Sequence, residues 1–193
     1  HLRWQESVDN GLRAIALATG DENLFYEVVS RYWTAICLLD MGNLDAARPH
    51  ALVLRDLAER RSTPRQNAGM GFAPITWLSC LEGDWKAGRE YSDRGLEVSP
   101  SNFQVLFPRV MLEHQTGEAA QGEVYLERLL EAMRRAGQGA SGRVSVAIAA
   151  IARITGVPGR LEIAEAAAEE VLSAQSVTPR EARTAKAGLA LLA

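Results

Sequence analysis

The residue types that most often do chemistry are few in this chain and lie far apart. Its three histidines, His1, His50 and His114, and its two cysteines, Cys37 and Cys80, form no cluster with the spacing of a metal site. The chain also lacks a Gly-x-Ser-x-Gly turn and a Gly-x-x-x-x-Gly-Lys-Ser/Thr phosphate loop. We therefore expect no catalytic residue, no bound metal, no cofactor and no enzymatic activity.

The net charge and the cysteine content indicate which partners this chain could bind and in which compartment it is expected. The 21 basic and 24 acidic residues give a formal net charge of −3. Domains that bind nucleic acid are usually strongly basic, so we expect no direct contact with nucleic acid. No apolar run is long enough to span a membrane. Two cysteines without a Cys-x-x-Cys pair favour a reducing, cytoplasmic location.

Apolar residues recur at helical spacing along the chain, whereas the alternation expected of a strand is nearly absent. In residues 119–133, for example, Leu126, Leu129 and Met133 recur at steps of three and four. Pro74 and Pro108 should either mark later helix starts or bend first turns. The sequence thus predicts an all-α chain with about ten helices, at residues 3–19, 22–41, 43–61, 66–82, 84–97, 102–116, 118–136, 142–155, 158–174 and 179–192.

Glycines end several of these periodic runs, and polar residues follow three of them. A glycine suits the left-handed position just past a helix because it has no Cβ to clash there. Asp21, Asn43 and Asp84 can then accept hydrogen bonds from the first free N–H groups of the next helix. The predicted turn glycines are Gly20, Gly42, Gly83, Gly117 and Gly156.

Three of these glycines begin one repeated sequence pattern. Residues 42–47 and 83–88 each contain a glycine, a capping residue, a large apolar residue, two spacers and a small residue, and residues 117–122 are a weaker copy. Gly83 and Gly117 are 34 positions apart. We expect the small residues, which are Ala47, Gly88 and Gly122, at buried contacts where two helices cross closely.

On these residues the chain resembles the tetratricopeptide repeat (TPR) family over nearly its whole length. The resemblance implies a single domain, 1–193, built as a right-handed superhelical array of antiparallel helix pairs, a TPR-like α-solenoid. Thr76 and Val110 depart from the family pattern, which prefers a small residue there, whereas Ala35 matches it.

The two ends of the chain suggest a piece of a longer protein. The first residue is His1 rather than Met, which is consistent with a tag remnant or a cut from a longer chain. No polar capping helix follows the last predicted helix, 179–192, although repeat arrays need one. We therefore expect either a fragment or self-association through that helix.

The divergent, Ala- and Leu-rich repeats further resemble the repeat region of large bacterial signalling proteins, which join an ATPase to a nucleotide-cyclase or DNA-binding output domain. That resemblance implies a non-enzymatic protein-interaction or sensor module of a signalling or transcription regulator. The alternative is a ligand- or peptide-sensing receptor domain of a transcription regulator. An all-helical enzyme is a third interpretation, which would need an enclosed pocket with converging ionisable groups.

The family resemblance also implies a concave groove, lined by the first helix of each pair, that binds a protein or peptide. The aromatic residues assigned to this groove could instead fill a tightly wound core, and that alternative stays open. We expect Trp33 and Trp85, in contrast, to pack in the core. Counting back from the turn glycines gives the predicted groove residues Tyr32, Ile36, Asp40, Trp77, Phe107, Met111, His114, Arg143 and Arg153.

Overall fold

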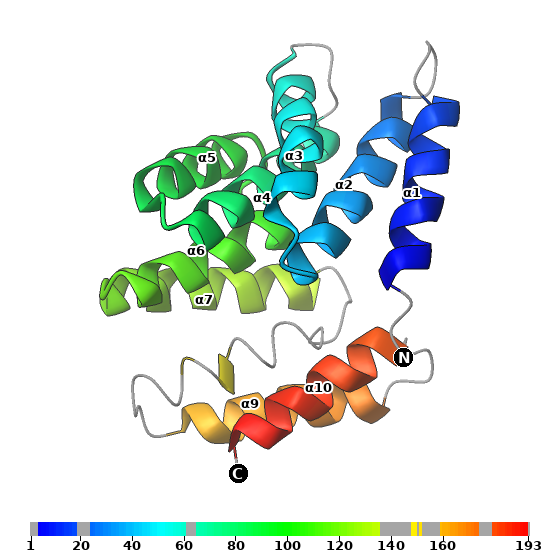
Figure 1. The fold of residues 1–193 in the computed structure, drawn as a ribbon. Coiled ribbons are helices and arrows are strands. Elements are labelled where there is room, and N and C mark those ends of the chain that lie inside the picture. The colour runs from blue at the N-terminus through cyan, green and yellow to red at the C-terminus, as the bar shows by residue number, and fades with distance from the viewer. Residues whose placement is uncertain are drawn as a thin grey trace. The chain divides into compact units, whose positions relative to one another are not determined.

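The structure is a computed structural model that describes residues 4–18, 24–60, 65–135, 148–149, 151, 159–173 and 179–192. Every regular element in these residues is helical, so the all-α prediction is confirmed. The helices are α1 (Trp4–Ala18), α2 (Leu24–Asp40), α3 (Leu44–Glu59), α4 (Arg65–Glu82), α5 (Trp85–Val98), α6 (Phe103–Gln115), α7 (Ala119–Arg135), α9 (Arg160–Ser173) and α10 (Pro179–Leu192) (Figure 1).

The chain divides into two compact units. Unit 1 is Arg3–Leu112 and contains α1 to α5 and most of α6. Unit 2 is Glu113–Ala193 and contains the end of α6 together with α7, α9 and α10. The single domain over residues 1–193 stays a prediction.

The tight turns form where the sequence predicts them. Gly42, Gly83 and Gly117 have φ angles of 75°, 77° and 83°, in the left-handed region that favours glycine. Asn43 Oδ1 accepts a hydrogen bond from the N–H of Ala46 at 3.3 Å. Asp84 Oδ1 accepts one from the N–H of Ala87 at 3.1 Å. Both predicted N-caps are therefore confirmed. The predicted turn at Gly20 and Asp21, and Gly156, lie outside the described residues.

The small residue five positions after each turn glycine is buried, as predicted. Ala47, Gly88 and Gly122 are all buried. A Cβ at Gly88 would lie 2.7 Å from Leu112 Cδ1, and one at Gly122 would lie 2.6 Å from His114 Nε2. These positions therefore allow close approach of the second helix of a pair to the first.

Pro74 and Pro108 lie within helices rather than at later helix starts. Helix α4 runs from Arg65 through Pro74, and α6 runs from Phe103 through Pro108. Of the two expected alternatives, a later helix start is therefore wrong, and neither proline lies in the first turn of its helix. Of the predicted helix 142–155, only residues 148, 149 and 151 are described, and they are helical.

In unit 1, each of the helices α1 to α4 packs on the helix that follows it in the chain. Helix α2 also packs on α4. Because α2 and α4 are the first helices of successive pairs, this contact places first helices side by side in one row. Figure 1 shows α1 at one end of unit 1 and α5 with α6 at the other.

In unit 2, α9 packs on α10. Ala168 and Val171 of α9 form a buried cluster with Ala185 of α10, and Leu189 packs against this cluster. Helix α9 therefore covers Ala185, and Leu189 is half-buried. The side chains of Leu191 and Leu192 lie outside the described residues.

Within the described ranges, no helix combines the length and the apolar character that crossing a membrane would need.

Candidate functional site

The first helices of unit 1 contact one another: α2 packs on α4, and a side chain of α4 reaches α6. Cys80 lies three residues before Gly83, and its Sγ lies 3.9 Å from the carbonyl oxygen of Pro108 on α6. The corresponding residue of α2 is Leu39, which is buried. Helices α2, α4 and α6 therefore form a row whose exposed side is a candidate binding surface.

Two aromatic rings meet on this row. Trp77 on α4 and Phe107 on α6 have ring centroids 5.4 Å apart with an interplanar angle of 54°. Both side chains are half-buried. Met111 is also half-buried and lies one helical turn after Phe107, on the same side of α6. We call Trp77, Phe107 and Met111 the aromatic face.

The aromatic face combines rigidity with exposed apolar area. A tilted aromatic pair adds favourable energy beyond simple burial and fixes the positions of both rings. Methionine adapts its shape to different apolar partners. The three side chains can therefore receive apolar groups of a ligand, but they supply no acid, base or nucleophile.

Comparison with known proteins identifies the fold. Neither the known protein families nor the curated proteins give a match to this chain. Among solved structures, BtubC (BKLC) from P. vanneervenii aligns with a TM-score of 0.63 and 14% identity, covering 99% of this chain and 85% of that one. TTC0263, a thermophilic TPR protein in Thermus thermophilus, aligns with a TM-score of 0.54 and 16% identity, covering 98% of each chain. The chain has a TPR-like helical repeat fold.

Within this TPR-like fold, the predicted groove residues fall into different environments. Trp77, Phe107 and Met111 form the aromatic face. Tyr32 and Ile36 lie in the core of unit 1 instead. They occupy a stripe of α2 that is buried along its length, so neither side chain is presented to a ligand.

The polar groove candidates also differ from one another. Asp40 is exposed at the end of α2. His114 was expected on the surface, but its side chain is only 2% exposed. The neighbouring Gly122 leaves space for the imidazole, and Glu123 Oε1 lies 3.7 Å from His114 Nε2. Arg143 and Arg153 lie outside the described residues.

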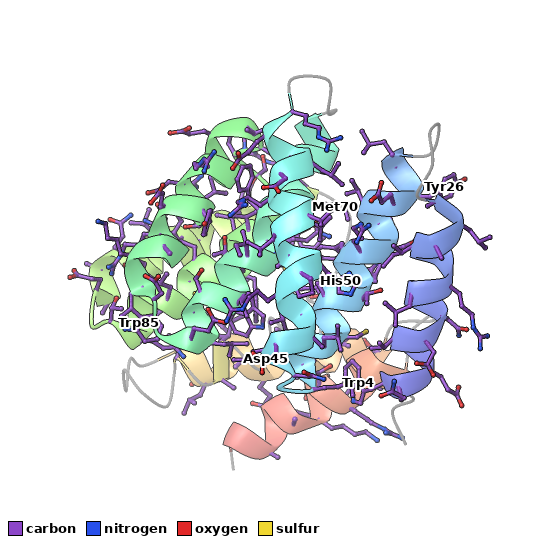
Figure 2. The ribbon with its side chains drawn as sticks, turned by 45° about the horizontal axis from the view of Figure 1, so that its top comes forward. Trp4, Tyr26, Asp45, His50, Met70 and Trp85 are labelled. Carbon is purple, nitrogen blue, oxygen red and sulfur yellow. The ribbon has the colours of Figure 1, made fainter. Side chains whose placement is uncertain are left out.

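One large aromatic residue was assigned to the wrong environment. Trp33 was expected in the core, yet it is 48% exposed. Trp85, the other tryptophan expected there, is half-buried at the start of α5 (Figure 2). A count from the turn glycine does not reveal this exposure, because it gives Trp33 the same repeat position as the buried Pro74 and Pro108.

The described ionisable groups do not converge on the aromatic face. No set of three or more His, Cys, Asp or Glu side chains in the described part of the chain is placed to hold a metal ion. His50, on α3, has a pKa below its ordinary value because the ring is partly buried and Arg31 of α2 repels the protonated form. His50 therefore favours its neutral form.

Proposed function

We propose that this chain is a non-enzymatic protein-interaction module that binds a segment of a partner protein on the aromatic face of unit 1. The observation that carries the proposal is the contact between Trp77 and Phe107, two half-buried rings on adjacent first helices of a TPR-like array. Stacked repeats of this kind offer extended binding surfaces rather than enclosed pockets.

Physical chemistry supports the choice of these residues as anchors. Tryptophan and other large aromatic side chains supply much of the binding energy at protein interfaces when they are only partly covered in the free protein. The Trp77 and Phe107 rings are already held against each other, so binding would order few new side-chain torsions. Asp40 is the proposed polar residue on α2, and Arg143 and Arg153, which lie outside the described residues, stay predicted groove residues.

We place this module in a cytoplasmic signalling or transcription regulator of bacteria. The supporting observations are the resemblance of the repeats to such regulators and the two buried cysteines, Cys37 and Cys80, which suit a reducing compartment. Self-association through α10 is part of the same proposal. Light scattering over a range of protein concentrations would detect it.

The test compares capture of partners by wild-type protein and by variants of the aromatic face. Trp77→Ala and Met111→Glu should each remove the same cross-linked partner, whereas Trp85→Ala, a matched tryptophan deletion on α5, should retain it. Titration of the purified partner should then show at least a tenfold loss of affinity for both face variants. Circular dichroism melts establish that each variant is folded.

Two outcomes would contradict the proposal. A partner retained equally by both face variants would show that the aromatic face is not the binding surface. Capture of a small molecule in place of a protein, with loss in Trp77→Ala, would favour the ligand-sensing receptor instead.

A further inference from the structure

Equivalent positions in the three first helices of unit 1 differ sharply in exposure. Trp33, Pro74 and Pro108 each lie nine residues before the turn glycine that ends the helix. Pro74 and Pro108 are buried, whereas Trp33 is 48% exposed. The largest of the three side chains is therefore the one that is exposed to solvent.

The difference follows from which helices have a first helix beside them. Pro108 lies close to α4, as the 3.9 Å contact between Cys80 Sγ and the Pro108 carbonyl oxygen shows. Helix α2 packs on α4, which carries Pro74. First and second helices alternate along the chain, so α1, which precedes the first helix α2, belongs with the second helices. Among the described residues no first helix comes before α1 in the chain, and Trp33 is left 48% exposed.

The surroundings of Trp33 suit apolar contact. Tyr26 lies seven residues earlier, on the same side of α2, and is exposed at the edge of unit 1 where α1 and α2 meet (Figure 2). Phe25 packs edge-to-face on Tyr26, with centroids 5.5 Å apart. The Trp33 ring packs edge-to-face on the buried Tyr32, with centroids 5.1 Å apart. The exposed tryptophan is therefore held in a defined orientation.

We propose that Tyr26 and Trp33 of α2 form a docking stripe for an amphipathic α-helix of a partner protein. The partner helix would pack on α2 in the same way as α2 packs on α4. Its apolar residues would follow the i, i+4, i+7 spacing of the buried stripe of α2, which is Tyr32, Ile36 and Leu39. This site goes beyond the aromatic face and does not depend on it.

The occupant is argued from continuity with an interface that the structure already contains. Helix α2 shows that a helix with this apolar spacing packs on the next first helix of the array. A helix laid on Trp33 would therefore continue the row by one element. It would cover an aromatic side chain of the kind that anchors protein interfaces.

The test uses a fluorescein-labelled synthetic peptide with the α2 sequence, residues 24–40, as a probe of known apolar spacing. Fluorescence anisotropy should show saturable binding to the 193-residue chain. Trp33→Ala should weaken this binding at least tenfold, and Trp85→Ala should leave it unchanged. A control peptide carrying Ile36→Glu on its apolar stripe should bind at least tenfold more weakly than the parent peptide.

Several results would overturn the inference. These are no saturable binding, equal binding to wild type and Trp33→Ala, and equal binding of the Ile36→Glu peptide. A dimer that dissociates on Trp33→Ala substitution would assign the stripe to a second copy of this chain. Trp33→Ala could also be made in a longer natural polypeptide. If it lowered the thermal stability of that polypeptide but not of the 193-residue chain, the stripe would be assigned to a helix of the same protein.

Discussion

Gly122 of α7 lies directly against the imidazole ring of His114 of α6. A Cβ at Gly122 would lie 2.6 Å from His114 Nε2, 2.7 Å from Cδ2 and 3.0 Å from Cε1. Both residues are buried in unit 2. The missing side chain of one residue thus creates the space that the ring of the other occupies.

Enlarging Gly122 should therefore destabilise unit 2. Gly122→Leu should lower the free energy of unfolding by about 1–3 kcal/mol, because the imidazole and both helices must shift to admit the new side chain. Gln121→Leu, which adds the same side chain at the exposed neighbouring position, should change it much less. Urea unfolding monitored by circular dichroism measures both. Equal stability of wild type and Gly122→Leu would contradict the assigned contact.

The local features of this fold could be predicted from the sequence because they depend on neighbours along the chain. The left-handed glycines Gly42 and Gly83, and the caps Asn43 and Asp84, are set by backbone sterics and by N–H groups only three residues away. The helical period likewise shows which side of each helix faces inward.

The burial of individual side chains by neighbouring helices could not be predicted in the same way, because it depends on residues far away in the sequence. Trp33 and Tyr32 are adjacent on α2, yet one is exposed and the other is buried. Their difference depends on which helices lie beside α2. His114 is buried because α7 brings Gly122 and Glu123 against it. Helical spacing alone does not encode these contacts.

Two buried glycines should respond differently to the same substitution. A Cβ at Gly71 would lie 2.6 Å from the backbone oxygen of Leu54 and 2.6 Å from Ala58 Cβ, so α3 and α4 would have to separate. A Cβ at Gly88 would meet Leu112 Cδ1, the end of a side chain that can rotate. Gly71→Ala should therefore destabilise unit 1 by about 1–3 kcal/mol.

Gly88→Ala should be near neutral, because the gain in helix propensity of about 1 kcal/mol offsets the smaller rearrangement. Thermal unfolding of the two single variants, at equal protein concentration, gives the comparison. A larger loss of stability for Gly88→Ala than for Gly71→Ala would contradict the close approach of α3 and α4 at Gly71.

Arg109 is a buried cation that joins α6 to α5. Its side chain donates hydrogen bonds to Ser92 Oγ at 2.7 Å and to the carbonyl oxygen of Arg89 at 3.3 Å, and it pairs with the carboxylate of Asp93 at 2.5 Å. Arg109 is only 6% exposed, whereas the side chain of Asp93 is 54% exposed. Removing the carboxylate would take one charged partner away from the buried guanidinium.

We therefore expect Asp93→Ala to lower the free energy of unfolding by about 1–2 kcal/mol, less than for a fully buried pair because Asp93 is half-exposed. Asp93→Ala should cost less in an Arg109→Met background, because the charge that the carboxylate compensates is then absent. Urea unfolding of the two single variants and the double variant forms a double-mutant cycle. Strictly additive losses would show that the two residues are not coupled.

His50 should make the stability of the fold depend on pH. His50 lies on α3 (Figure 2). Arg31 of α2, whose charge acts on His50, pairs through Nε with Glu27 Oε1 at 2.7 Å. Burial, and secondarily the positive charge of Arg31, lower the pKa of His50 in the folded protein from its ordinary value of about 6.5. Below about pH 6.5, His50 is therefore protonated more readily in the unfolded chain than in the folded one.

Because the unfolded state binds more protons in this range, stability should be fully present above about pH 6.5 and should decline as the pH falls below it. His50→Gln keeps a neutral polar side chain and should remove this part of the decline, leaving the contributions of the other titrating groups. Urea unfolding of both proteins between about pH 7.5 and pH 5 measures the two slopes. Parallel curves for wild type and His50→Gln would show that burial and Arg31 do not depress the pKa of His50 in the folded protein.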